Sequence, residues 1–151
     1  MQRDWNSRST GRTPSEPFAE LCDIPREECL LLITSVPIGR LAVVGPNGAP
    51  YVVPVNFAVD RDRIYFRSDD GTKLTAGLAQ LCTFQADVID AYRHTGWTVL
   101  IHGRVAHAES LPAELDSWLR PGRHVLCMEP TEVSGRRIAL ADVPLDGRGY
   151  L

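Results

Sequence analysis

Two basic and two hydroxyl residues lie close together in FRSDDGTKL, residues 66–74. Arg67 and Lys73 carry positive charge, and Ser68 and Thr72 carry hydroxyl groups that can bind an oxyanion. A loop that wraps several phosphates needs a Gly-x4-Gly-Lys-Ser/Thr frame, because consecutive backbone N–H groups must surround them. This stretch has Gly71 but lacks the second glycine of that frame. We therefore expect it to bind a single phosphate or none.

The same stretch also has the features of a helix start. Asp69 or Asp70 suits the N-cap position, which would leave free backbone N–H groups around residues 71–73 at the positive end of a helix. Such a terminus attracts anions. The two acids weaken this interpretation, and a capped helix with a solvated Lys73 is at least as acceptable from these residues alone. Lys73 is the only lysine in the chain, which adds modest weight to a phosphate role.

A second candidate site is the tripeptide PVN, residues 54–56, inside a β-branched run. Pro54 cannot donate a backbone hydrogen bond, so within a sheet it belongs at an edge or a bulge. Asn56 adds an amide that needs partners if it is buried. Unpaired backbone groups beside this amide could bind the polar edge of a flat heterocycle. An ordinary edge strand is the alternative, and this stretch alone favours it.

The other polar and aromatic residues give weaker signals. Trp97 begins a predicted strand, where its indole could cover a ring system, although a tryptophan more often packs in a core. The histidines show neither the His-x3-His nor the Cys/His spacing of a metal site, so we predict no metal; they are His94, His102, His107 and His124. No Gly-x-Ser-x-Gly motif supports a hydrolase.

Composition limits the classes of partner. The chain has 151 residues, 44% of them hydrophobic, which suits one domain with a core of its own. The net charge of −3 argues against nucleic acid, and no apolar run is long enough to span a bilayer. The four cysteines lack Cys-x-x-Cys spacing and are expected to be buried thiols in a reducing cytoplasm: Cys22, Cys29, Cys82 and Cys127.

Apolar periodicity divides the chain into a tail and one domain. Residues 1–20 lack a periodic apolar face and are predicted to form a disordered tail, with the domain at 21–151. A short helix is expected from Ile24, with Pro25 at its first position, and further helices at 71–81 and 111–119. Strands are predicted at 38–45, 50–60, 63–68, 82–90, 97–108 and 124–133. Asn47-Gly48 predicts a hairpin between the first two, and RIYFRS extends it to an antiparallel meander.

Six mainly antiparallel strands with short helices between them predict a small, closed or partly closed barrel. The order of the motifs along the chain indicates a resemblance to a known protein family. The chain resembles the pyridoxamine 5'-phosphate oxidase-like family of FMN-binding split barrels, particularly its nitroimidazole-resistance-like branch. The segments that carry this resemblance are ECLLLITSVPIGRLAVV, NGAPYVVPVNFAV, IYFRSDDGTKL, TGWTVLIHGRV and VSGRRI, over residues 24–138.

The resemblance implies a six-stranded antiparallel split barrel that works as a homodimer, with two FMN sites at the subunit interface. It also implies which residues bind the flavin. Val53, Pro54, Val55, Asn56 and Phe57 would lie along the isoalloxazine ring, Arg67 and Ser68 near the ribityl chain and phosphate, and Thr72 and Lys73 at the phosphate. Trp97 and Thr98 match positions that reach the flavin from the partner subunit, and Arg137 matches a position near the pocket.

The implied activity is redox exchange at the flavin, between a reduced nicotinamide and an unidentified small-molecule acceptor, with no catalytic protein residue required. Residues specific for pyridoxamine phosphate are not recognisable. A split barrel that binds F420 or haem is one alternative, but F420 favours more basic residues and haem an axial ligand. A non-catalytic flavin-binding or sensing module is another, which the sequence does not exclude.

Overall fold

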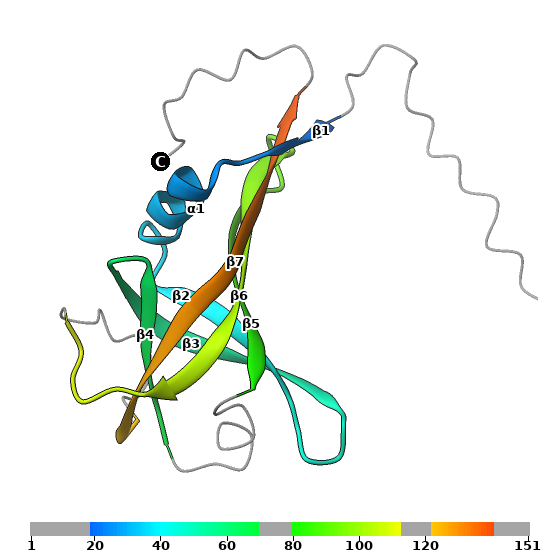
Figure 1. Cartoon of the computed structure of the whole chain (residues 1–151). Helices are drawn as coiled ribbons and strands as arrows, with labels where there is room; N and C mark the ends of the chain where they lie inside the picture. Colours follow the sequence, from blue (N-terminus) through cyan, green and yellow to red (C-terminus); the bar gives the residue numbers. More distant parts are fainter. Residues whose placement is uncertain (1–18, 70–79, 113–121, 141–151) are drawn as a thin grey trace, which may run out of the picture.

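Six strands close into one antiparallel ring. In the computed structural model, residues 19–69, 80–112 and 122–140 are described. The strands of the ring are β2 (Ile38–Val44), β3 (Pro50–Asp60), β4 (Arg63–Ser68), β5 (Leu81–Asp90), β6 (Thr95–His107) and β7 (His124–Leu140). Hydrogen-bonded neighbours follow the order β7, β4, β3, β2, β5, β6 and return to β7 (Figure 1). The predicted mainly β, six-stranded antiparallel fold is confirmed.

The predicted meander forms the first half of the ring. β2 pairs with β3 and β3 with β4, both antiparallel. At the tip of the first hairpin the N–H of Gly48 donates to the carbonyl of Gly45 at 2.9 Å, and Gly48 has φ 77°. Asn47 accepts a hydrogen bond from the N–H of Ala49 through its side chain, at 3.1 Å. Asn47-Gly48 therefore makes the turn, because glycine adopts positive φ without steric cost.

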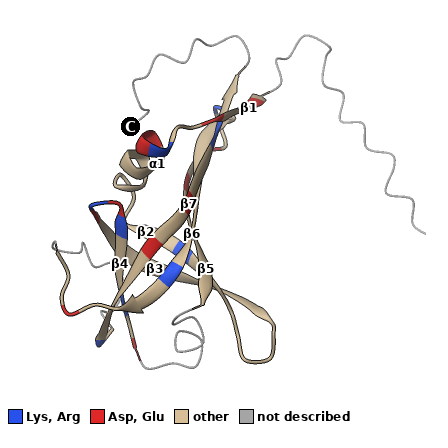
Figure 2. Ribbon diagram, viewed as in Figure 1, with Lys and Arg blue, Asp and Glu red and all other residues tan. Residues whose placement is uncertain are grey.

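Alternation along the strands builds the core inside the ring. In β5, for example, Cys82, Phe84 and Ala86 are buried while the residues between them face outward. The rings of Phe57 and Phe84 meet edge to face, with centroids 4.7 Å apart. Gly39 lies under Phe84, since a Cβ on this glycine would be 2.4 Å from the phenyl ring. Most of the ribbon of the ring carries neither acidic nor basic residues (Figure 2).

One helix covers the far half of β7. α1 (Arg26–Ile33) begins directly after Pro25, which holds the N-cap position with φ −59°. Pro25 was predicted at the first helical position, so the helix begins one residue later than predicted. Cys29 and Ile33, four residues apart, are its buried side chains. They face the sheet where β7 has Gly135, because a Cβ there would be 2.5 Å from the Cys29 sulfur. The absence of a side chain at Gly135 thus allows α1 to pack closely on the sheet.

Several boundaries differ from the prediction. β1 (Ala19–Asp23) was not predicted, and it pairs with the last residues of β7, so Ala19 and Glu20 belong to a strand. β7 continues to Leu140, seven residues beyond the predicted end. Leu81 starts β5 and does not end a helix. The remaining tail, residues 1–18, and most of the two predicted helices, residues 71–79 and 113–119, lie outside the described residues.

The prediction that all four cysteines are buried is wrong for two of them. Cys29 and Cys82 are buried, whereas Cys22 and Cys127 are half-buried, and all four are free thiols. Cys22 lies on the outermost strand β1, and Cys127 alternates with the buried Leu126 and Met128. Burial raises the pKa of the Cys29 and Cys82 thiols, with Glu28 contributing at Cys29.

Within the described ranges, no helix is long and apolar enough to cross a bilayer.

Candidate functional site

The sheet splits where β3 and β4 part. Their paired residues run from Asp60 opposite Arg63 to Phe57 opposite Phe66. Before Phe57, β3 continues to pair with β2 as far as Pro50, but no described residue pairs with its other edge. Pro54 lies in this open-edged segment, as its missing N–H predicts. Because backbone groups of a strand alternate between its two sides, the open edge of residues 53–55 presents N–H and C=O groups that no described residue pairs in the sheet.

The end of β4 lies beside this open edge. Arg67 and Ser68 follow Phe66 directly, and they pair with β7 on their other side. Arg67 is exposed and Ser68 is buried, with only 8% of its surface accessible. The Ser68 hydroxyl donates to the carbonyl of Asp69 at 3.0 Å. The fold therefore brings together the two stretches that sequence analysis selected, the PVN segment and the beginning of FRSDDGTKL.

Asn56 fixes the open segment to the rest of the domain. Its side-chain Nδ2 donates to the carbonyl of Pro37 at 2.9 Å, which links β3 to the connection between α1 and β2. Val55 and Phe57, its neighbours, are buried in the core. Val53 is half-buried and Pro54 is exposed, so the segment has one face in the core and one face outside.

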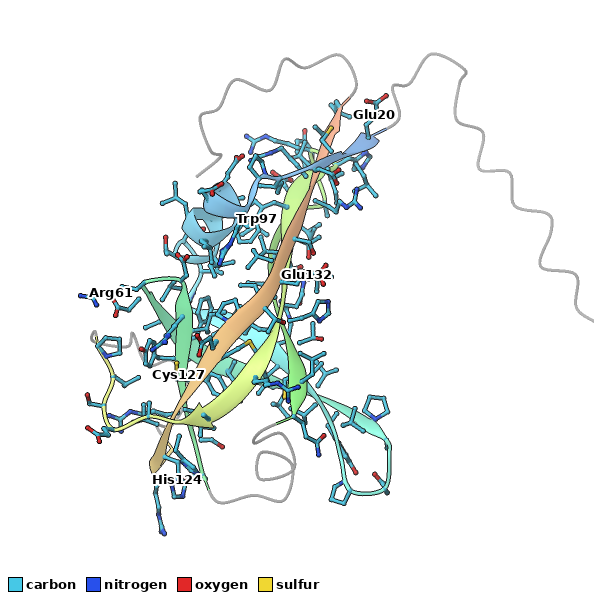
Figure 3. The ribbon with its side chains drawn as sticks, viewed as in Figure 1. Glu20, Arg61, Trp97, His124, Cys127 and Glu132 are labelled. Carbon is cyan, nitrogen blue, oxygen red and sulfur yellow. The ribbon has the colours of Figure 1, made fainter. Side chains whose placement is uncertain are left out.

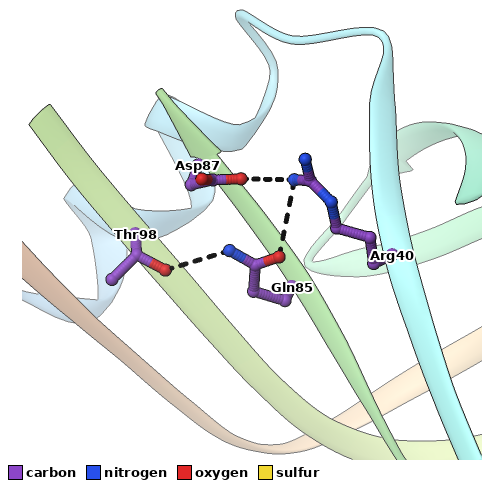
Figure 4. Close-up of polar contacts among 4 residues, drawn as sticks. All are labelled: Arg40, Gln85, Asp87 and Thr98. Carbon is purple, nitrogen blue, oxygen red and sulfur yellow. Dashed lines mark hydrogen bonds and ion pairs between the residues drawn. The ribbon is translucent and has the colours of Figure 1, made fainter. Parts of the chain in front are cut away.

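A polar network lies on the outer side of the ring, next to Pro54 (Figure 4). Arg40, which is paired with Pro54 in the ladder, forms an ion pair with Asp87 and donates to Gln85 at 3.5 Å. Gln85 in turn donates to the Thr98 hydroxyl at 3.2 Å. Three strands, β2, β5 and β6, thus present linked polar groups on one face.

Trp97 and Arg137 lie away from the split. Trp97 is 5% exposed and belongs to the core, on the part of β6 near α1 (Figure 3). It is opposite Arg137 in the ladder, and Arg137 forms a half-buried ion pair with Glu28 of α1. His124, which is opposite Ser68, lies at the other end of the ring (Figure 3). Within one chain, this packing favours the core role of Trp97.

The structure gathers part of the predicted set. Residues brought together around the split are Val53, Pro54, Val55, Asn56, Phe57, Arg67 and Ser68. Thr98 lies three strands away from Pro54 on the outer face, and Trp97 and Arg137 lie beyond it along the sheet. Thr72 and Lys73 lie outside the described residues. Among the described residues, no group of three or more His, Cys, Asp and Glu side chains could hold a metal ion.

Residues 25–137 match the family model described as pyridoxamine 5'-phosphate oxidase. The chain belongs to this family. The match spans α1 and the ring except for the last three residues of β7, so it covers both sides of the split. An uncharacterized protein of Mycobacterium tuberculosis is 27% identical over 148 residues, which cover 87% of this chain and 95% of that protein.

Several solved structures are similar to this member of the pyridoxamine 5'-phosphate oxidase family. The FAD binding protein from Mycobacterium smegmatis has a TM-score of 0.65 at 28% identity, covering 78% of this chain and 98% of that one. A FAD-binding protein from Mesorhizobium loti reaches 0.67 at 24% identity, over 80% and 98% of the two chains. A candidate 5-nitroimidazole antibiotic resistance protein from Bacteroides thetaiotaomicron reaches 0.65 at 14% identity, over 86% and 96%. The last two comparisons show a shared fold.

Sequence analysis missed part of this family member's polar surface. Arg40, Gln85 and Asp87 were not selected, although Gln85 and Asp87 occupy alternate positions of a strand and so share one face. That alternation was a usable signal for an outward polar pair. Their contact with Arg40 depends on the pairing of β2 with β5, which are more than forty residues apart in the chain.

Replacement of Asn56 by alanine is expected to destabilise the domain by about 1 kcal/mol, since it removes a half-buried hydrogen bond and leaves the Pro37 carbonyl without this donor. Urea unfolding followed by tryptophan fluorescence measures the difference. Asn56→Asp keeps the shape, loses the N–H and places a carboxylate beside the Pro37 carbonyl, so it should cost at least as much as Asn56→Ala. Wild-type stability in Asn56→Ala would show that this bond does not hold the segment.

Proposed function

We propose that this chain is a cytoplasmic, homodimeric flavoprotein that binds FMN at the split between β3 and β4. As an oxidoreductase it would pass electrons from a reduced nicotinamide to a small-molecule acceptor. The observation that carries the proposal is the position of the open β3 edge directly beside Arg67. A flat heterocycle with hydrogen-bonding groups fits the open β3 edge, and an anionic substituent of that heterocycle fits Arg67.

The residues at the split fit a flavin with one phosphate. Backbone groups of residues 53–55 pair with no described residue on one side, and we infer that they bond the polar edge of an isoalloxazine ring. Arg67 supplies a planar, permanently charged donor for the phosphate. The nearby Ser68 hydroxyl donates to the Asp69 carbonyl and would turn from it to bind the phosphate. Thr72 and Lys73 follow within five residues and complete the phosphate contacts by family resemblance. A single phosphate agrees with the missing second glycine.

Bound flavin would supply the redox chemistry, accepting a hydride from a nicotinamide and giving electrons to an acceptor. The chain's part is to bind and orient the flavin through the open backbone edge and Arg67. No side chain is assigned a nucleophilic or acid–base role. Buried Val55 and Phe57 support this edge from the core side, so its shape is fixed by packing.

FAD is the second candidate cofactor. The structural relative from Mycobacterium smegmatis, at 28% identity, is described as FAD binding. FAD carries a diphosphate, which requires more donors than Arg67 and Ser68 offer among the described residues. We therefore place FMN first. The mass of the cofactor released from purified protein by denaturation distinguishes FMN, FAD, F420 and haem in one measurement.

The decisive experiment is an absorption spectrum of the purified chain, before and after addition of FMN. Flavin bands that stay with the protein on gel filtration are the expected result. A colourless protein that fails to bind added FMN or FAD would overturn the proposal. If flavin binds, oxidation of NADH or NADPH with several acceptors tests the enzyme activity. Flavin binding without any turnover would favour the non-catalytic module.

The outer face of the ring is the surface that we propose for the second copy. Four neighbouring strands, β3, β2, β5 and β6, expose apolar side chains there, namely Val52, Val44, Leu81 and Leu100. Arg40 and Asp87 on this face pair with each other, so these two groups add no net charge that would repel a copy of the face, and Arg104 also lies on it, opposite Leu81. Thr98 lies on the same face, as the partner-contributed role from family resemblance requires.

Leu100→Arg is expected to convert the dimer to a monomer, because two copies would bring like charges into an apolar contact. Leu31→Arg is the matched control, since Leu31 is equally apolar and 71% exposed but lies on α1. Light scattering after gel filtration gives the mass of each variant. A wild-type monomer, or a Leu100→Arg dimer, would contradict this placement of the interface.

A further inference from the structure

The end of β4 is held from one side only. Pairing with β3 stops at Phe66, so the described neighbour of Arg67 and Ser68 in the sheet is β7. There, Arg67 is opposite Val125 and Ser68 is opposite His124. The position of Arg67 relative to the open edge of β3 therefore depends on how the beginning of β7 meets the end of β4.

Gly122 makes the closest part of this contact. A Cβ on this buried glycine would lie 2.1 Å from the carbonyl carbon, 2.4 Å from the carbonyl oxygen and 2.5 Å from the Cα of Ser68. All three are backbone atoms, so rotation of a side chain cannot relieve the overlap. Any residue other than glycine at this position must push the two backbones apart.

A hydrogen bond fixes Asp69, the residue directly after β4. The Asp69 carboxylate accepts from the backbone N–H of Arg123 at 3.2 Å. Asp69 also accepts the Ser68 hydroxyl at its carbonyl, 3.0 Å away. Asp69 and Gly122 thus join the end of β4 to the residues just before β7, through two contacts of different kinds.

We propose that Gly122 and Asp69 are positioning residues, which set Arg67 and Ser68 for the flavin phosphate. This inference rests on the proposed function. Neither residue needs to touch the ligand. Gly122 sets the separation of the two backbones, and Asp69 ties the end of β4 to Arg123. Hydrogen bonds weaken steeply with distance and angle, so a small displacement of Arg67 would reduce the phosphate contact while the core stays intact.

The test compares FMN with riboflavin, which has the same ring system and no phosphate. Dissociation constants for both come from quenching of flavin fluorescence, and their ratio isolates the contribution of the phosphate. We expect Gly122→Ala and Asp69→Ala to reduce the wild-type preference for FMN over riboflavin by roughly tenfold. This is the effect expected from the loss of about one charge-assisted hydrogen bond to the phosphate. Asp69→Asn is the matched control. It keeps the acceptor oxygen and removes a negative charge, so it should retain the preference or increase it.

A thermal unfolding curve for each variant separates positioning from stability. A purely structural role would lower the Tm and weaken both ligands equally, leaving the ratio unchanged, and that result would overturn the inference. If Gly122→Ala does not fold, the Asp69→Ala and Asp69→Asn pair decides. Wild-type protein that binds neither flavin would refute the proposed function itself. Wild-type preference for FMN with unchanged ratios in the variants would refute this inference alone.

Discussion

Phe84→Ala is expected to lower the free energy of unfolding by about 3–5 kcal/mol, a large fraction of the stability of a typical domain. Phe84 is fully buried in β5, its ring fills the space above Gly39, and it packs edge to face against Phe57. Truncation of Phe84 leaves a cavity, and the closed ring of six strands cannot collapse to fill it. Chemical unfolding measures the loss, and the Tm should fall by roughly 10 °C.

Phe84→Leu separates the effect of losing the aromatic ring from the effect of losing buried side-chain volume. It keeps a large apolar side chain and should cost clearly less than the alanine change. Tyr92→Ala is the surface control, since Tyr92 is 94% exposed in the turn before β6 and its side chain lies outside the core. A decrease in the free energy of unfolding below 1 kcal/mol in Phe84→Ala would mean that the six strands do not close around the Phe84 side chain.

The six strands of the ring were predictable because each carries its own pattern. β2 places Leu41 and Val43 inward with outward residues between them, and β4 does the same with Ile64 and Phe66. The first hairpin was predictable from Asn47-Gly48, a local signal. Closure of the ring between β6 and β7 followed only from the count of strands and from family resemblance.

β1 was not predictable, for a physical reason. Its residues, AELCD, show no alternation, because four of them are exposed and only Cys22 is half-buried. The strand exists through its pairing with the end of β7, and that partner lies more than a hundred residues away in the chain. The extension of β7 to Leu140 has the same origin, since its last residues pair with β1.

The candidate site was predictable as two separate stretches and not as one place. Pro54 indicated an open edge, and Arg67 indicated an anion site, each from local chemistry. Their proximity depends on the register that sets Phe57 opposite Phe66. Gly122 carried no signal in the sequence, because its importance comes from a backbone contact with Ser68, about fifty residues earlier.

Arg67→Ala is expected to weaken FMN binding by roughly tenfold to a hundredfold, and to leave riboflavin binding nearly unchanged. Loss of a charge-assisted hydrogen bond to phosphate costs about 1.5–3 kcal/mol, and each 1.4 kcal/mol corresponds to a factor of ten. Arg67 is exposed at the end of β4 and adjacent to the open edge, so its removal should leave the core intact. Flavin fluorescence titrations with both ligands measure the effect.

Arg63→Ala is the matched control for this prediction. Arg63 starts the same strand, alternates with the same buried residues and is also exposed, but it lies beside the turn at the opposite end of β4. There it pairs with Glu129 at 3.5 Å, an exposed ion pair that contributes little to stability. Equal loss of FMN affinity in both variants would indicate a general effect of positive charge. Selective loss in Arg67→Ala locates the phosphate at the split, because the two arginines differ chiefly in their distance from the open edge.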